Sequence, residues 1–169
     1  RGYKPRQVLL GGNHDERYLR LIQSQPKLAG SIRSPWAYAE SLGWEFHPFL
    51  KVVKIDGVSY SHYFPRGPNG TVVNSKRGAP SARAQVMREM TSCVAGHKPG
   101  LDVHIQPTAH GMVRGIIAGS FYQHEEEYLS PQGTQYWRGI LMLHEVKNGD
   151  FNLMEVSLDY LARKYGGKK

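Results

Sequence analysis

The sequence has little cysteine and no long hydrophobic run, and each shortage excludes a class of protein. Because Cys93 is the single cysteine, a disulfide-stapled secreted scaffold is excluded, and we expect a cytoplasmic protein in a reducing compartment. No apolar run approaches the roughly 20 residues of a membrane-spanning helix, and no signal peptide is visible, so we expect no membrane partner. Cys93 lies in an apolar run before Gly96, which indicates a buried structural thiol.

Acidic residues are also scarce relative to basic ones. The chain has 14 Asp and Glu against 22 Lys and Arg, which gives a formal net charge of +8. This excess favours phosphate-bearing partners, with nucleic acid as the obvious candidate, although a basic soluble protein of another kind has the same balance. The length of 169 residues and the 40% hydrophobic content predict one domain, residues 1–169, with a core of its own.

The most informative stretch is the glycine-rich segment 11–17, which directly follows the apolar run 7–10. This order predicts a strand, a tight turn and a helix that begins at Asp15 and is capped by it. Asn13 and His14 then lie at the carboxyl end of a strand, where open α/β sheets place their ligand sites. The alternative is a glycine-rich turn with an Asx cap and a solvent-exposed histidine.

Two further predicted strands end on a histidine. Asp56-Gly57 indicates a hairpin turn, and the alternating segment that follows it ends on His62. A run of small residues, 92–95, leads to Gly96-His97. We expect Asn13, His14, His62 and His97 to converge on one side of a sheet, although His62 on an edge strand is also compatible with a simple surface residue.

The segment Gly12-Asn13-His14-Asp15, placed behind a strand, resembles the third motif of the calcineurin-like metallophosphoesterases. That family builds a two-metal site from five blocks in fixed order: Asp-x-His, Gly-Asp-x-x-Asp, Gly-Asn-His-Asp/Glu, a lone His, and Gly-His-x-His. Ser61-His62 is similar to the fourth block and Gly96-His97 to part of the fifth. The resemblance therefore covers nearly all of this chain but only the second half of the family's domain. Because the chain opens on Arg1, we expect it to be a piece of a longer protein.

The resemblance implies an α/β/β/α sandwich of two packed sheets flanked by helices, of which this chain would supply the C-terminal half with a mixed sheet. It implies hydrolysis of a phosphoester by a hydroxide activated by two divalent metal ions, Mn, Fe or Zn. Asn13, His62 and His97 would hold one ion. His14 would protonate the leaving oxygen or stabilise the transition state.

The sequence departs from the family pattern at the fifth block. Pro99 stands where a second metal-binding histidine is expected, and proline cannot bind a metal. His104, on the predicted strand 101–106, could replace it as a ligand. Asp102-Val103-His104 also spells Asp-x-His, but nothing similar to Gly-Asp-x-x-Asp follows it, so a circular permutation is the weaker alternative.

The segment 63–80 is rich in turn residues and predicts a long loop beside His62. Arg66 and Arg77 in this loop could bind a substrate phosphate, and Tyr63 and Phe64 could stack on a base, although a solvated loop has the same composition. Two other function classes stay open. One is a catalytically degenerate binding or scaffold module of the same fold, and the other is a basic nucleic-acid-binding module. The metal content of the purified protein would distinguish the metal-dependent phosphoester hydrolase from these two binding modules.

Overall fold

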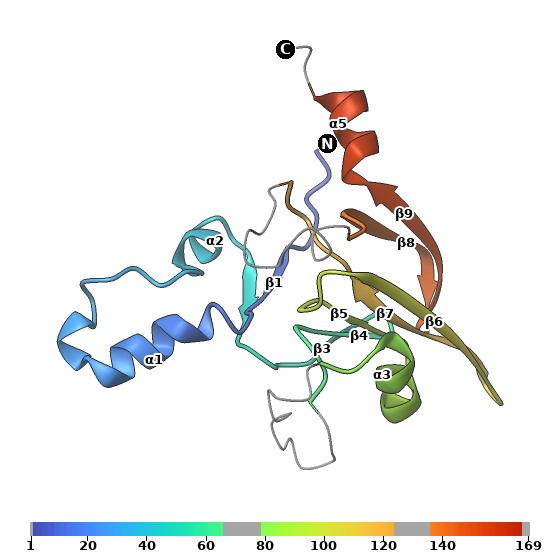
Figure 1. Ribbon diagram of the computed structural model, residues 1–169, viewed down its shortest axis with the longest axis horizontal. Helices are drawn as coiled ribbons and strands as arrows, with labels where there is room; N and C mark the ends of the chain where they lie inside the picture. The colour runs from blue at the N-terminus through green and yellow to red at the C-terminus, as the bar shows by residue number, and fades with distance from the viewer. Residues whose placement is uncertain (1, 66–78, 124–135, 167–169) are drawn as a thin grey trace.

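A five-stranded mixed sheet forms the centre of the structure (Figure 1). The structure is a computed structural model that describes residues 2–65, 79–123 and 136–166. The strand order is β3-β4-β5-β7-β6, in which β4, β5 and β7 are parallel and the two edge strands run antiparallel to their neighbours. The strands are β3 (Val53–Ile55), β4 (Val58–Ser61), β5 (Cys93–Ala95), β6 (Leu101–Thr108) and β7 (Gly111–Ala118). The expected mixed α/β class is confirmed.

The hairpin predicted at Asp56-Gly57 is confirmed and joins β3 to β4. Both turn residues have positive φ angles, 49° for Asp56 and 85° for Gly57. Such angles match the right-handed twist of paired strands, and Asp and Gly tolerate them best. The turn therefore fixes the register that brings β4 to its end at Ser61.

Helix α3 (Ala82–Glu89) covers one face of the sheet. Ser81 caps its first turn, since the Ser81 hydroxyl accepts a hydrogen bond from the Ala84 N–H at 3.2 Å. The helix packs directly on the backbone of Gly115 in β7, where an added Cβ would lie 2.2 Å from the Ala82 carbonyl oxygen. The core on this side consists of Phe64, Val86, Cys93 and Ala95. The expected burial of the Cys93 thiol is confirmed.

A two-stranded hairpin covers the opposite face of the sheet (Figure 1). It consists of β8 (Gly139–Lys147) and β9 (Asp150–Ser157), and the chain continues from it into helix α5 (Leu158–Tyr165). Val58, Ile116 and Phe151 form the buried centre between sheet and hairpin. The molecule is thus layered as a helix, a sheet and a second, smaller sheet. None of the described helices is long and apolar enough to cross a membrane.

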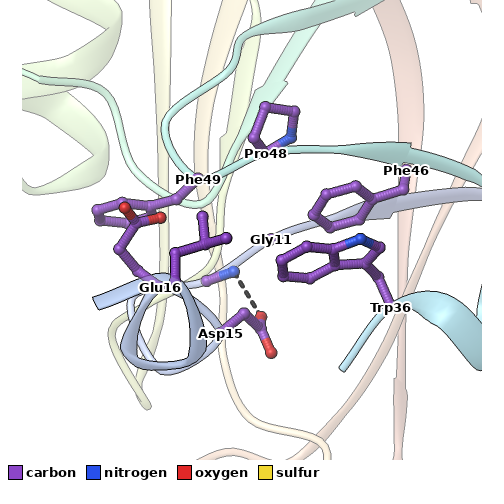
Figure 2. Close-up of a pocket in the computed structure, with 9 residues that line it drawn as sticks. Gly11, Asp15, Glu16, Trp36, Phe46, Pro48 and Phe49 are labelled. Carbon is purple, nitrogen blue, oxygen red and sulfur yellow. Dashed lines mark hydrogen bonds between the residues drawn. The ribbon is translucent and has the colours of Figure 1, made fainter. Parts of the chain in front are cut away.

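The N-terminal segment adds a small parallel sheet and two helices, α1 and α2, which extend to one side in Figure 1. Its elements are β1 (Val8–Leu10), α1 (Glu16–Ser24), the 3-10 turn η1 (Pro26–Leu28), α2 (Ala37–Ser41) and β2 (Glu45–His47). The rings of Trp36 and Phe46 stack at 4.5 Å and tie α2 to β2. They line an apolar cavity of about 60 Å³ behind the Gly11-Gly12 turn (Figure 2).

Candidate metal centre

The ends of four strands open into one pocket of about 560 Å³. Strands β1, β4, β5 and β7 each lead into residues of its wall, so the pocket lies where strand ends meet, as expected for a ligand site of an α/β sheet. The lining residues are Leu10, Gly12, Asn13, His14, Asp15, His62, His97, Lys98, Pro99, Gly119, Ser120, Tyr122 and Tyr136.

Three side chains meet in this pocket with their polar atoms in contact. The His62 Nε2 atom lies 2.9 Å from the Asn13 Oδ1 atom and 3.0 Å from the His97 Nδ1 atom. The three residues are far apart in the sequence and come from the ends of β1, β4 and β5. We call Asn13, His62 and His97 the triad.

The turn before α1 is shaped to let His62 approach. An added Cβ on Gly12 would lie 3.1 Å from the His62 Cε1 atom, so a larger residue would press on the imidazole ring. The Asp15 carboxylate accepts a hydrogen bond from the Gly12 N–H at 2.8 Å, and this bond closes the turn that carries Asn13 (Figure 2). The prediction that Asp15 caps the helix with its side chain is wrong, because its carboxylate instead binds backwards to the turn.

His97 is held in an unusual backbone conformation. Its φ angle is 65°, a left-handed value that non-glycine residues seldom adopt. The Lys98 N–H donates to the Gly96 carbonyl at 2.8 Å, which closes a three-residue turn centred on His97. The Gly96 N–H donates to the His62 carbonyl at 3.1 Å and ties this turn to the end of β4. Strained residues of this kind persist where the surrounding structure holds them and often belong to functional sites.

Both histidines of the triad are kept in the neutral form that binds metals. Burial, followed by the nearby His97 and His14 rings, lowers the pKa of His62 from 6.5 to about 4, although the Asp15 carboxylate opposes the shift. Burial, His14 and Lys98 lower the pKa of His97 as well. At neutral pH each ring therefore has a nitrogen lone pair available for an electrophile.

The spacing of the triad suits one metal ion. Ligand atoms that sit about 2.1 Å from an ion are about 3.0–3.4 Å apart in octahedral or tetrahedral geometry, and the two measured contacts are 2.9 and 3.0 Å. A single N–H on His62 can point well at only one of its two neighbours, whereas a cation satisfies all three donor atoms. Among the described residues, no three His, Cys, Asp or Glu side chains form a metal-binding group. The third donor of the triad is the amide oxygen of Asn13.

The remaining predicted residues have different outcomes. His14 lines the pocket and is exposed, next to Asn13, so it is placed to meet a bound molecule. His104 lies outside the pocket: it sits on β6, pairs with Gly115 in the ladder, and its Nε2 atom is 3.4 Å from the Gln106 Oε1 atom. The prediction that His104 replaces the missing ligand is wrong on geometric grounds. Arg66 and Arg77 lie outside the described residues.

Three expectations about neighbouring residues also change. Tyr63 and Phe64 are 9% and 1% exposed and belong to core clusters, so they are not available for stacking on a base. Asp102 accepts a hydrogen bond from the Ala82 N–H at 2.8 Å and helps to fix the start of α3. That structural role removes the support for a permuted Asp-x-His block.

Four polar residues of the pocket are not among the predicted site residues, namely Lys98, Ser120, Tyr122 and Tyr136. A signal exists for Ser120, because Gly119-Ser120 directly follows an apolar strand, in the same way as the other site residues. Lys98 adjoins the predicted ligand His97 in the sequence. The two tyrosines enter the pocket only through the fold.

No protein-family model matches the chain, and neither a curated protein nor a solved structure matches it.

Proposed function

We propose that this chain contributes one metal site of a metal-dependent phosphoester hydrolase of the calcineurin-like metallophosphoesterase type. The observation that carries the proposal is the convergence of Asn13 Oδ1, His62 Nε2 and His97 Nδ1 at ligand spacing. The layers of helix, sheet and second sheet support an α/β/β/α sandwich, and the single cysteine supports a cytoplasmic location.

The pocket residues would have two different roles, metal binding and proton donation. The triad would hold a divalent ion, Mn, Fe or Zn, which when bound polarises a phosphoryl oxygen and neutralises its charge. His14 lies beside Asn13 and is exposed to the pocket, where it can donate a proton to the leaving oxygen of the ester. The lowered pKa values of His62 and His97 keep these two rings neutral and available as metal ligands.

The test is a calorimetric titration of Mn²⁺ into the chelator-treated chain, followed by assays with bis(nitrophenyl) phosphate and nitrophenyl phosphate. We expect wild type to bind Mn²⁺ and His62→Ala to lose at least tenfold in affinity, since even residues behind the ligands contribute 10–100-fold. His144→Ala is the matched control, because His144 is exposed on β8. Equal Mn²⁺ affinity in the two variants would contradict the metal site. Mn²⁺ binding without hydrolysis by the longest natural form of the protein would favour the binding or scaffold module.

A further inference from the structure

The pocket contains a cation that the triad does not use. Lys98 follows His97 directly, is half-buried and lines the pocket. Among the residues that the structure describes, no carboxylate forms an ion pair with Lys98 and no hydrogen bond to its ammonium occurs. The Lys98 ammonium can therefore pair with an anion that enters the pocket.

The backbone at Lys98 is fixed from both sides. The Lys98 N–H is held by the Gly96 carbonyl at 2.8 Å. Pro99 follows, and a proline restricts the residue before it to extended conformations. The Ser120 hydroxyl donates to the Pro99 carbonyl at 2.9 Å, which anchors this segment to the end of β7. Lys98 is therefore attached to a rigid part of the pocket wall. Little conformational entropy of the Lys98 backbone is lost when an anion binds.

Lys98 lies next to the triad in the pocket wall. It adjoins the proposed ligand His97 in the chain, and both residues line the pocket. The carboxylate of Asp15, the acidic residue in the pocket lining, already accepts from the Gly12 N–H. The polar groups left facing a ligand are donors or neutral groups, which favours a bound anion.

We propose that Lys98 binds a non-bridging oxygen of the substrate's phosphate group beside the triad. This inference rests on the proposed function and assigns a substrate-binding residue to it. An ammonium is a compact charge that interacts with phosphate without strict directionality, which suits a group that also contacts a metal ion. The substrate class is then a phosphate ester whose anionic oxygens reach both the triad and Lys98.

The experiment titrates orthophosphate into the chain, with and without Mn²⁺, for wild type and for Lys98→Gln, Lys98→Arg and Lys54→Gln. Lys54 is exposed on β3, so its variant removes the same charge away from the pocket. We expect Lys98→Gln to lose roughly ten- to hundredfold in phosphate affinity, the value of one charge-assisted hydrogen bond. Lys98→Arg should recover part of the loss, and Lys54→Gln should match wild type. Melting temperature should be retained in all the variants, and none of them should lose Mn²⁺ affinity, because the triad remains.

Two results would overturn the inference: wild-type phosphate affinity in Lys98→Gln, or equal losses in Lys98→Gln and Lys54→Gln. The second result would mean that phosphate responds to the overall net charge. If wild type takes up no Mn²⁺, the proposed function fails instead. The metal-free phosphate titrations then decide about Lys98 separately.

Discussion

At the scale of single residues, the triad depends on neighbours that contribute no donor atom to it. Gly12 leaves space for the His62 ring, and Asp15 holds the turn that presents Asn13. The exposed ring of His14 is then the remaining imidazole of the pocket lining. The placement of the His62 ring and the proton transfer proposed for His14 can therefore be tested separately, by substitutions at Gly12 and at His14.

Gly12→Ala tests the placement of His62. The new methyl group would lie 3.1 Å from the His62 Cε1 atom, which is closer than ordinary contacts, so the ring must shift by a few tenths of an ångström. We expect Mn²⁺ affinity to fall about 10–100-fold, as for other residues that orient a ligand. Calorimetry measures the change. Gly100→Ala is the control, because its added Cβ would have open space around it among the described residues. Equal affinities in the two variants would show that His62 is not held against Gly12.

His14→Ala tests the proposed role of His14 as a proton donor. Metal content should stay nearly intact because Asn13, His62 and His97 remain. Turnover should fall roughly 10²–10⁴-fold, the usual range for a positioned acid. The loss should be greatest for alkyl esters, whose leaving groups need a proton, and smaller for nitrophenyl esters. Steady-state rates for both ester types in the metal-loaded protein measure this difference. If the substitution strips the metal, or slows both ester types equally, His14 has another role.

At the scale of elements, the turn after β5 brings His97 to the triad at a conformational cost. The left-handed φ angle of 65° is unfavourable for histidine, and the hydrogen bonds from Lys98 to Gly96 and from Gly96 to His62 hold it. A glycine at this position would adopt the same backbone without strain.

Replacement of His97 by glycine and by alanine measures that strain. Both variants lose the ligand, but His97→Gly should be about 1 kcal/mol more stable toward unfolding than His97→Ala, because only alanine retains a Cβ in the left-handed region. Urea titrations of the metal-free proteins give the difference. Val52 is not among the residues with a positive φ angle, so the order should reverse there, with alanine more stable because glycine loses more conformational freedom on folding. A less stable glycine variant at position 97 would contradict the strained turn.

At the scale of the whole molecule, the site and the core occupy different parts of the fold. The triad lies at strand ends, whereas the β8–β9 hairpin packs on a face of the sheet through Phe151. Arg114 of β7 forms an ion pair with Asp150 of β9, and its guanidinium lies 5.2 Å from the centre of the Phe151 ring. The hairpin thus contributes mainly to stability.

Phe151→Ala should separate stability from metal binding. Phe151 is 3% exposed, and the loss of a buried phenyl ring costs about 3–5 kcal/mol. Mn²⁺ affinity of the folded protein at low temperature should stay near wild type, since the triad residues follow β1, β4 and β5. Urea unfolding and calorimetry measure the two quantities. Phe121→Ala, at a ring that is 66% exposed, should leave stability nearly unchanged. A parallel loss of metal affinity in Phe151→Ala would show that the hairpin supports the site.

Much of the local structure could be predicted from the sequence. The Asp56-Gly57 hairpin and the strand before Gly11 follow from backbone preferences of a few adjacent residues. Helix α5 follows β9 directly, since the hydroxyl of Ser157, the last residue of the strand, accepts a hydrogen bond from the Tyr160 N–H at 3.2 Å and caps the helix.

By itself, the sequence determined which strands end on Asn13, His62 and His97, because a strand and its turn are specified by neighbouring residues. The tertiary structure decided which of these residues meet. Parallel pairing of β4 with β5 brings His62 to His97. His104 instead lies inside edge strand β6, where it pairs with Gly115 of β7, and α3 contacts both strands. The burial of Tyr63 and the placement of Lys98 in the pocket wall were likewise decided by packing. The physical reason is that distances between residues far apart in the chain depend on strand register and layer packing, which no local pattern encodes.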